Sequence, residues 1–141
     1  MPTQLVNFLQ GGKTAVLATL DQQGLPHTAL FSWVVAKDSK HVRLAIGKGS
    51  TTLKNIRSNG KLTISVQGPG MAYGVKGKAK VIKDTIKSSP MPCVLVELVV
   101  EQVKDDNAPG ITITTGIGYK WDQNPEQMAK VESDVFEELR S

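Results

Sequence analysis

Residues 43–66, RLAIGKGSTTLKNIRSNGKLTISV, decide the fold of this chain of 141 residues. Two apolar segments flank a segment of helix-forming residues that has turn residues at both of its ends. The stretch therefore predicts a strand over residues 43–46, a glycine-bracketed turn over 47–49, a helix over 51–58 and a second strand over 61–66.

The start of this helix has the chemistry of an anion site. Ser50 stands at the N-cap, where its hydroxyl can accept an amide proton that the first turn leaves unpaired. The free amides and the positive end of the helix dipole point to one place, and Lys48 and Lys54 are close enough to add charge. An ordinary capped helix with solvated lysines is the alternative, and local chemistry leaves both open. Asn59 and Gly60 end the helix, because both tolerate a left-handed conformation.

The rest of the chain predicts mainly strands joined by turns, with a short helix over residues 3–9. Connections between the early strands are too short for helical crossovers, which disfavours a parallel sheet. The expected fold is therefore mainly β, a small β-barrel with a few helices that forms one domain over residues 1–141. The expected strands cover residues 13–20, 26–36, 41–46, 61–66, 71–83 and 93–103, and a strand or extended arm covers 111–121.

Lysines alternate with apolar residues in the predicted strand over residues 71–83. Lys76, Lys78 and Lys80 fall on one side of it, opposite Val75 and Ala79. The strand either faces phosphate or is half-buried, with solvated lysines that discourage aggregation at a sheet edge. The sequence alone favours the second interpretation.

A predicted helix closes the chain. Asn124 stands at its cap, Pro125 at its first position, and Gln127 is placed to complete a capping box. Its apolar stripe is expected to pack on the chain's own barrel, with a dimer contact as the alternative. The stripe consists of Met128, Val131, Val135, Phe136 and Leu139.

Composition limits the possible classes of protein. Cys93 is the only cysteine, so no internal disulfide can form, which suits a reducing cytoplasm. No run approaches about 18 apolar residues, and residues 1–13 lack a basic leader, so we expect no membrane span and no secretory signal. The net charge of +4 would attract a phosphorylated small molecule, but it falls short of a dedicated nucleic-acid binder.

Candidate catalytic groups are few. His27 and His41 are the only histidines, and neither has the spacing of a metal site. Cys93 precedes an apolar run and is expected to be a buried, inert thiol. We therefore expect no metal and assign no catalytic residue; any enzymatic chemistry would come from a cofactor.

Three segments, in order, resemble the pyridoxamine 5′-phosphate oxidase-like family of FMN-binding split barrels. They are GLPHTALFSWVV (24–35), HVRLAIGKGSTTLKNIRSNGKLTISV (41–66) and GVKGKAKVI (74–82). Members have a Gly-x-Pro-His strand, a strand ending in Gly-Ser, a helix with Lys and Asn, and a strand with Gly-Lys-Ala. The resemblance covers about residues 13–83. It implies an antiparallel, Greek-key-like split barrel and a homodimer with flavin sites at the subunit interface.

The resemblance also implies where FMN would lie. Its phosphate would lie against the turn at 47–49 and the following helix, and its ring beside the strands at 26–36 and 41–46. Ser50 matches the family's phosphate-binding serine. The resemblance implies that the cofactor residues are Thr28, Ser32, Trp33, Ala45, Ile46, Ser50, Thr51, Thr52, Lys54 and Asn55. We add Lys48 to this set, because its charge lies close to the helix start.

Departures from the family pattern limit the expected activity. Thr51 and Thr52 stand where the family often has Arg and Lys, and each lost charge-assisted hydrogen bond weakens binding by about 1.5–3 kcal/mol. The oxidase also has an arginine and a lysine on its second strand, where this chain has about Thr28 and Trp33. Its basic residues for the substrate phosphate are not recognisable here, so genuine pyridoxamine 5′-phosphate oxidase activity is not expected. We expect an FMN-dependent oxidoreductase or flavin reductase acting on a small molecule. The alternative is a non-enzymatic ligand-binding or stress protein that holds F420, haem or no cofactor.

Nucleic-acid binding is the weakest hypothesis from sequence. It would use the lysines of the 71–83 strand, Lys83 included. Small barrels that bind single strands usually offer aromatic platforms, and only Tyr73 lies nearby.

Overall fold

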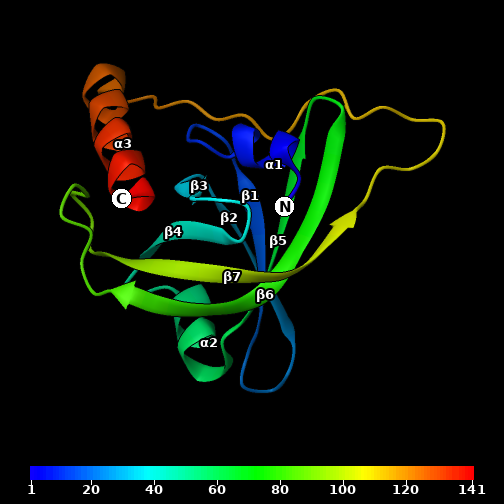
Figure 1. Cartoon of the computed structure of the whole chain (residues 1–141). Helices are drawn as coiled ribbons and strands as arrows, with labels where there is room; N and C mark the ends of the chain where they lie inside the picture. Colours follow the sequence, from blue (N-terminus) through cyan, green and yellow to red (C-terminus); the bar gives the residue numbers. More distant parts are fainter.

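The structure, a computed structural model of residues 1–141, contains one sheet of seven antiparallel strands and three helices. The strands lie in the order β2-β1-β5-β6-β7-β4-β3. The sheet curls into a split barrel, which confirms the mainly β fold (Figure 1). The strands are β1 (Ala15–Leu20), β2 (Pro26–Phe31), β3 (Val34–Ala36), β4 (His41–Gly47), β5 (Lys61–Gly68), β6 (Met71–Lys83) and β7 (Cys93–Asp105), and the helices are α1 (Thr3–Phe8), α2 (Thr51–Asn59) and α3 (Pro125–Arg140).

The barrel closes at a break in the segment that the sequence predicts as one strand. Within residues 26–36, β2 pairs with β1 and β3 pairs with β4, and only Ser32 and Trp33 connect them. β2 is the first strand in the sheet order and β3 is the last, yet the connection between them spans only about 10 Å. The sheet must therefore curl until its ends meet, and the unpaired gap between them is the split. The prediction of a single strand is wrong, because an apolar run does not show which neighbour each half pairs with.

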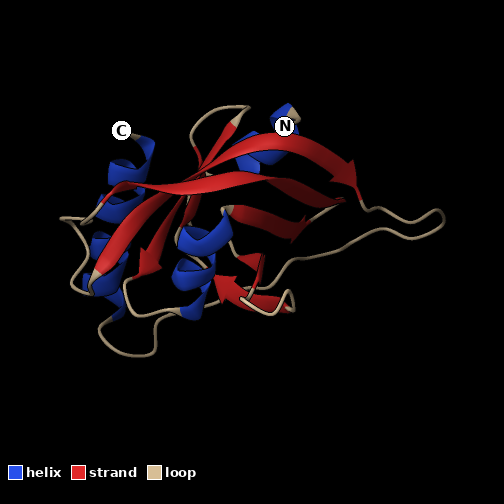
Figure 2. Ribbon diagram, turned by 90° about the horizontal axis from the view of Figure 1, so that it is seen from below, coloured by secondary structure: helices blue, strands red, loops and turns tan.

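Apolar side chains on the inner face of the sheet form the main core, and α1 and α2 lie at its two ends (Figures 1 and 2). Leu5 and Leu9 enter the core from α1 and the residue after it, and Leu53 and Ile56 enter from α2. Burying each such side chain contributes about 1.5–3 kcal/mol. None of the helices combines the length and the apolar character needed to cross a membrane.

The predicted ends of α2 are confirmed. The Ser50 hydroxyl accepts a hydrogen bond from the Leu53 N–H at 3.2 Å, as an N-cap does. Gly60 ends the helix with φ 69°, a left-handed conformation that glycine adopts without strain. Because both ends are fixed by the sequence, the position of α2 relative to β4 and β5 is fixed too.

α3 packs its apolar stripe on the outer face of β3, β4 and β7, as expected. Val135, Phe136 and Leu139 are buried in a second core cluster with Trp33 and Leu95, among others. The predicted side-chain cap of α3 is wrong. Asn124 adopts a left-handed conformation with φ 50°, and its side chain makes no cap hydrogen bond. The following Pro125 disfavours the ordinary helical region for the residue before it, and asparagine tolerates the left-handed alternative.

β6 is the central strand of the seven, paired with β5 on one side and β7 on the other. Exposed lysines opposite the buried Val75 and Ala79 confirm a half-buried strand with solvated lysines. The lysines protect no sheet edge, so that part of the interpretation is wrong. Sheet order depends on which strands pair over long distances, and alternation along one strand does not reveal it.

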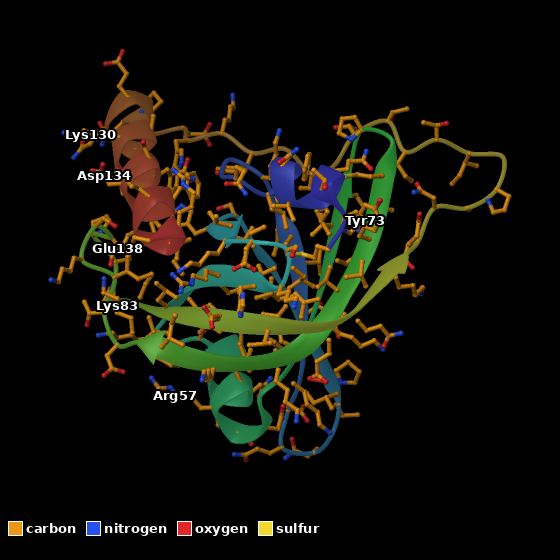
Figure 3. The ribbon with its side chains drawn as sticks, viewed as in Figure 1. Arg57, Tyr73, Lys83, Lys130, Asp134 and Glu138 are labelled. Carbon is orange, nitrogen blue, oxygen red and sulfur yellow. The ribbon has the colours of Figure 1, made fainter.

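Glu138 ties α3 to the loop between β6 and β7 (Figure 3). Its carboxylate accepts hydrogen bonds from the Lys83 ammonium, the Ser88 hydroxyl at 2.8 Å, and the backbone N–H groups of Ser88 and Lys87 at 3.0 and 3.1 Å. Burial alone would raise the pKa of Glu138. The four donors outweigh burial and lower this pKa from 4.5 to about 2.

Glu138→Gln is expected to remove a pH-dependent part of the stability. A folded-state pKa below the unfolded value gives stability that is present above pH 4.5 and is lost as the pH falls toward 2. The lowered pKa of Glu138 corresponds to about 3 kcal/mol of folding free energy at neutral pH. Urea unfolding from pH 7 downward should show the variant less stable at neutral pH, with the two stability curves converging near pH 2. Curves that stay parallel over this range would contradict the assignment.

Candidate functional site

A basic hollow of about 390 Å³ lies at the turn between β4 and α2. Three of its lining side chains are cations, and none of the three forms an ion pair. The first turn of α2 contains no acidic residue, and its free backbone N–H groups add positive partial charge. The hollow therefore has the electrostatics of an anion site. Its lining consists of Lys48, Gly49, Ser50, Thr51, Leu53, Lys54 and Arg57.

The sequence analysis missed Arg57, which extends from α2 in Figure 3. It follows Lys54 by three residues, and residues three apart share a helix face. That spacing was a sufficient signal to find it. Lys48, the third cation, donates a hydrogen bond from Nζ to the Thr85 hydroxyl at 3.2 Å.

Ser50 uses its hydroxyl within the cap. The hydroxyl accepts from the Leu53 N–H and donates to the Gly47 carbonyl at 2.9 Å. An anion in the hollow would therefore meet the backbone N–H groups of Thr51 and Thr52, which the geometry of a helix start leaves without intrahelical partners.

Two of the predicted α2 residues point into the protein. Thr52 and Asn55 are each 2% exposed, and the Asn55 amide donates to the Thr19 hydroxyl of β1 at 3.0 Å. They share the inner face of α2 with Leu53 and Ile56. Their side chains therefore hold α2 against the barrel rather than face the hollow.

A second hollow, of about 270 Å³, lies at the split. It is mostly apolar, which suits a planar ring rather than a charged group. Gly47 lines it at the end of β4, and the next residue, Lys48, lines the basic hollow, so the two hollows adjoin. The lining consists of Leu30, Phe31, Ser32, Trp33, Ala45, Gly47, Met91, Pro92, Cys93 and Trp121.

A buried carboxylate joins three elements behind this second hollow. Glu132 of α3 is 8% exposed, and its Oε2 accepts hydrogen bonds from the Trp33 indole N–H and from the Tyr119 hydroxyl, both at 2.9 Å. Burial raises the pKa of Tyr119, and the Glu132 carboxylate raises it further. Tyr119 therefore stays protonated at neutral pH and keeps donating to Glu132.

The chain between β7 and α3, residues 106–124, contains no strand, so the predicted strand or extended arm over 111–121 is an arm. Trp121 lines the apolar hollow from this arm. Its indole N–H is buried and has no hydrogen-bond partner in the protein. Leaving such a donor unsatisfied costs about 1–3 kcal/mol.

The structure gathers most of the predicted cofactor residues around these two hollows. Thr28 lies exposed on β2 outside both, and Ile46 is fully buried in the core. Contact of any of them with a cofactor stays a prediction. The basic hollow contains Lys48, Ser50, Thr51 and Lys54, and the apolar hollow contains Ser32, Trp33 and Ala45.

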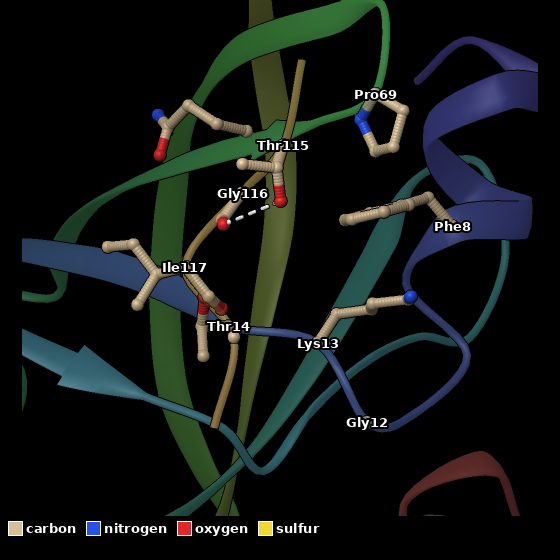
Figure 4. A pocket seen from close by; sticks show the side chains of 10 residues that line it. Phe8, Gly12, Lys13, Thr14, Pro69, Thr115, Gly116 and Ile117 are labelled. Carbon is tan, nitrogen blue, oxygen red and sulfur yellow. Dashed lines mark hydrogen bonds between the residues drawn. The ribbon is translucent and has the colours of Figure 1, made fainter. Parts of the chain in front are cut away.

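A third hollow, of about 160 Å³, lies between α1, the β5–β6 turn and the arm (Figure 4). Its one cation, Lys13, has Nζ 5.0 Å from the centre of the Phe8 ring. The arm approaches β5 closely here, because a Cβ on Gly116 would lie 2.1 Å from the Gln67 carbonyl oxygen. None of the predicted cofactor residues lines this hollow.

Groups for acid–base or metal chemistry do not gather in the basic hollow or in the apolar hollow. The Nδ1 of His41 lies 2.8 Å from Asp38 in an exposed turn, and Cys93 is buried. Groups of three or more His, Cys, Asp or Glu side chains that could hold a metal are absent.

Comparison with known proteins places the fold in a family. The family model of pyridoxamine 5′-phosphate oxidase matches residues 1–106. The chain belongs to the pyridoxamine 5′-phosphate oxidase family. The matched region of this family member contains all seven strands and α2, whereas the arm and α3 follow it.

Individual relatives of this family member are distant. The protein YclD of Bacillus subtilis, itself uncharacterized, is 28% identical over 131 residues, which covers 89% of this chain and 81% of YclD. HupZ from Group A Streptococcus is 20% identical with a TM-score of 0.66, over 84% of this chain and all of that one. An F420 reductase is 16% identical with a TM-score of 0.62, over 74% of this chain and 98% of that one. General Stress Protein 26 of Bacillus anthracis is 15% identical with a TM-score of 0.59, over 82% of this chain and 97% of that one. At these identities the solved structures support the fold alone.

Proposed function

We propose that this member of the pyridoxamine 5′-phosphate oxidase family binds FMN and acts as a flavin-dependent oxidoreductase or flavin reductase. One observation carries the proposal: the basic hollow at α2 adjoins the apolar hollow at the split, through Gly47 and Lys48. FMN is divided in the same way, with a phosphate at one end and a planar ring at the other.

The residues present fit each end of this cofactor. Lys48, Lys54 and Arg57 supply three positive charges where the family's Arg and Lys are replaced by Thr51 and Thr52. At the apolar end, Trp33 and Trp121 line the hollow with aromatic side chains, which suits a planar ring.

The chain's own residues would bind and orient the cofactor, and FMN, when bound, supplies hydride or electron transfer. Leu30 and Trp33 would exclude water from the ring, since both line the apolar hollow. Glu132 holds Trp33 and Tyr119 through its two hydrogen bonds, so it fixes the wall of the hollow.

The proposal includes a cytoplasmic homodimer. β2 is an end strand of the sheet, and Leu25 and Leu30, beside and within it, are 61% and 55% exposed. Apolar side chains at an unpaired strand edge favour contact with a second copy. The single Cys93 is a free thiol, in keeping with a reducing compartment. Sedimentation equilibrium should give twice the mass of 15.2 kDa.

The first experiment is a visible absorption spectrum of the purified protein, repeated after FMN is added and the sample is desalted. Retention of a flavin spectrum supports the proposal. Loss of all FMN on desalting, together with no binding in a fluorescence titration, contradicts it.

Replacing Lys54 and Arg57 together by alanine is expected to weaken FMN binding at least about tenfold. Each charge-assisted hydrogen bond contributes about 1.5–3 kcal/mol, which solvent screening reduces at these exposed positions. Fluorescence titration with FMN and with riboflavin, which lacks the phosphate, measures the effect. Riboflavin affinity should stay unchanged in the variant.

A matched control for this pair is Lys37→Ala with Lys40→Ala, which removes the same charge from the exposed turn before β4. The control should bind FMN as the wild type does. Equal weakening in both double variants would show a general charge effect and would contradict a phosphate site at α2.

A non-enzymatic ligand-binding or stress protein is the second candidate, with F420, haem or no cofactor. The observation favouring it is the lack of histidine and carboxylate groups in both hollows. Haem addition discriminates the haem case: a Soret band lost in His27→Ala or His41→Ala supports it, and no band in the wild type excludes it.

A further inference from the structure

Four lysines share the outer face of β5 and β6. Lys61, Lys76, Lys78 and Lys80 are all exposed, and none lies within ion-pair distance of a carboxylate. Lys61 and Lys78 are directly opposite each other in the β5–β6 pairing. Like charges in such a pair destabilise a sheet, so this basic face lowers the stability of the free protein.

The ordinary explanations for such lysines do not apply here. β6 is the central strand, so its lysines protect no edge. α3 covers the other half of the outer surface, where Ala45 of β4 and Leu95 of β7 are buried against it. The basic face has no such cover.

The positive charge of the basic face equals the net charge of the whole protein in size. The chain has 17 basic and 13 acidic residues. Without Lys61, Lys76, Lys78 and Lys80, basic and acidic residues are equal in number. The nearby carboxylates do not neutralise the face: Glu97, opposite Lys80, is paired with Arg43 at 3.0 Å, and Glu101 stands at a bulge of β7. Four exposed lysines without an ion pair are thus clustered on one face, which is the footprint of a binder of polyanions.

We propose that the basic face binds the sugar–phosphate backbone of double-stranded nucleic acid without regard to base sequence. Lysines at alternate positions of β6 share one side of the strand, with steps of about 6.7 Å between neighbours. Thr63, Ser65 and Gln67 lie beside them on the outer face of β5, and hydroxyl and amide groups commonly contact phosphate and sugar.

Two further observations select a duplex. The outer face offers no aromatic platform for bases, because the Tyr73 ring packs against the core and its hydroxyl donates to Gln4 at 3.4 Å. Single strands would therefore lose their main source of affinity. A second copy of this chain is disfavoured, because a symmetric contact would place the same four charges against one another.

Fluorescence anisotropy with a labelled 24-base-pair duplex tests the proposal over 20–200 mM salt. The wild type should bind, equally for two unrelated sequences, with affinity that falls steeply as salt rises. The variant Lys61→Gln, Lys76→Gln, Lys78→Gln and Lys80→Gln should bind at least about tenfold more weakly, and its salt slope should be shallower by about 3.6.

The matched control replaces four lysines elsewhere, Lys13, Lys37, Lys40 and Lys130, by glutamine and reaches the same net charge. It should bind the duplex more tightly than the basic-face variant, with a salt slope close to that of the wild type. Thermal unfolding of both variants shows that they are folded, and the basic-face variant should melt no lower than the wild type. No duplex binding by the wild type at 20 mM salt overturns the proposal. Equal losses in the two variants, or binding only to anionic lipid vesicles, overturns it as well.

Discussion

Gly77→Ala is expected to destabilise the protein by about 3 kcal/mol or more, although it adds a single methyl group. Gly77 lies at the bulge where the β6–β7 pairing shifts register. A Cβ built there would lie 1.9 Å from the Val99 carbonyl oxygen and 3.1 Å from the backbone nitrogen of Glu101. Both are backbone atoms of the neighbouring strand, so no side-chain rotation can relieve the clash. Relief requires the two central strands to separate locally, which breaks ladder hydrogen bonds.

Gly118→Ala is the matched control for this substitution. Gly118 has no positive φ, and a Cβ there would meet nothing within 4 Å. Its free energy of unfolding in urea should stay within about 0.5 kcal/mol of the wild type. A Gly77→Ala variant as stable as this control would contradict the bulge geometry. The expected loss of stability in Gly77→Ala would also give a physical reason for the glycine of the Gly-Lys-Ala segment. From the sequence alone, that segment is only a resemblance.

Local chemistry made much of the fold predictable. Ser50 and Gly60 mark the ends of α2, because a hydroxyl cap and a left-handed glycine act within four residues. Alternation likewise predicted the long β6, while β-rich runs predicted β7 and, around the turn residues 21–24, the β1–β2 hairpin. In each case the residues that determine the structure lie inside the element itself.

Long-range pairing could not be predicted in this way. The break at Ser32 exists because its two flanking strands pair with β1 and β4, which lie on opposite sides of the split. The central position of β6 has the same origin, and it changes the meaning of Lys76, Lys78 and Lys80 from edge protection to an uncovered face.

In the candidate site, too, local features could be predicted from the sequence and long-range contacts could not. Lys48, Ser50 and Lys54 were predictable from the turn and the helix start, and Arg57 could have been found from its i, i+3 spacing to Lys54. The wall of the apolar hollow could not be predicted from the sequence, because Trp33 and the Glu132 that holds it are 99 residues apart. α3, which supplies Glu132, also follows the part of the chain that the family model matches.

Glu132→Ala is expected to lower the free energy of unfolding by about 2–4 kcal/mol. The substitution leaves the buried Trp33 N–H without its acceptor, removes the partner of the Tyr119 hydroxyl, and opens a cavity beneath α3. Urea unfolding measures the loss, and the Trp33 emission should shift to longer wavelength as water enters.

Glu132→Gln is the control, because its amide oxygen can still accept from Trp33 while the negative charge is gone. Its stability should stay within about 1 kcal/mol of the wild type. The pKa of Tyr119 should fall, since a neighbouring carboxylate no longer opposes ionisation of the phenol, although burial still holds that pKa above its ordinary value. Near-ultraviolet absorbance titration follows this change. An unchanged Tyr119 pKa in Glu132→Gln, or full stability in Glu132→Ala, would show that the carboxylate does not hold this wall. With the wall intact, Trp33 and Tyr119 stay fixed against α3, so the apolar hollow at the split depends on a residue that α3 supplies.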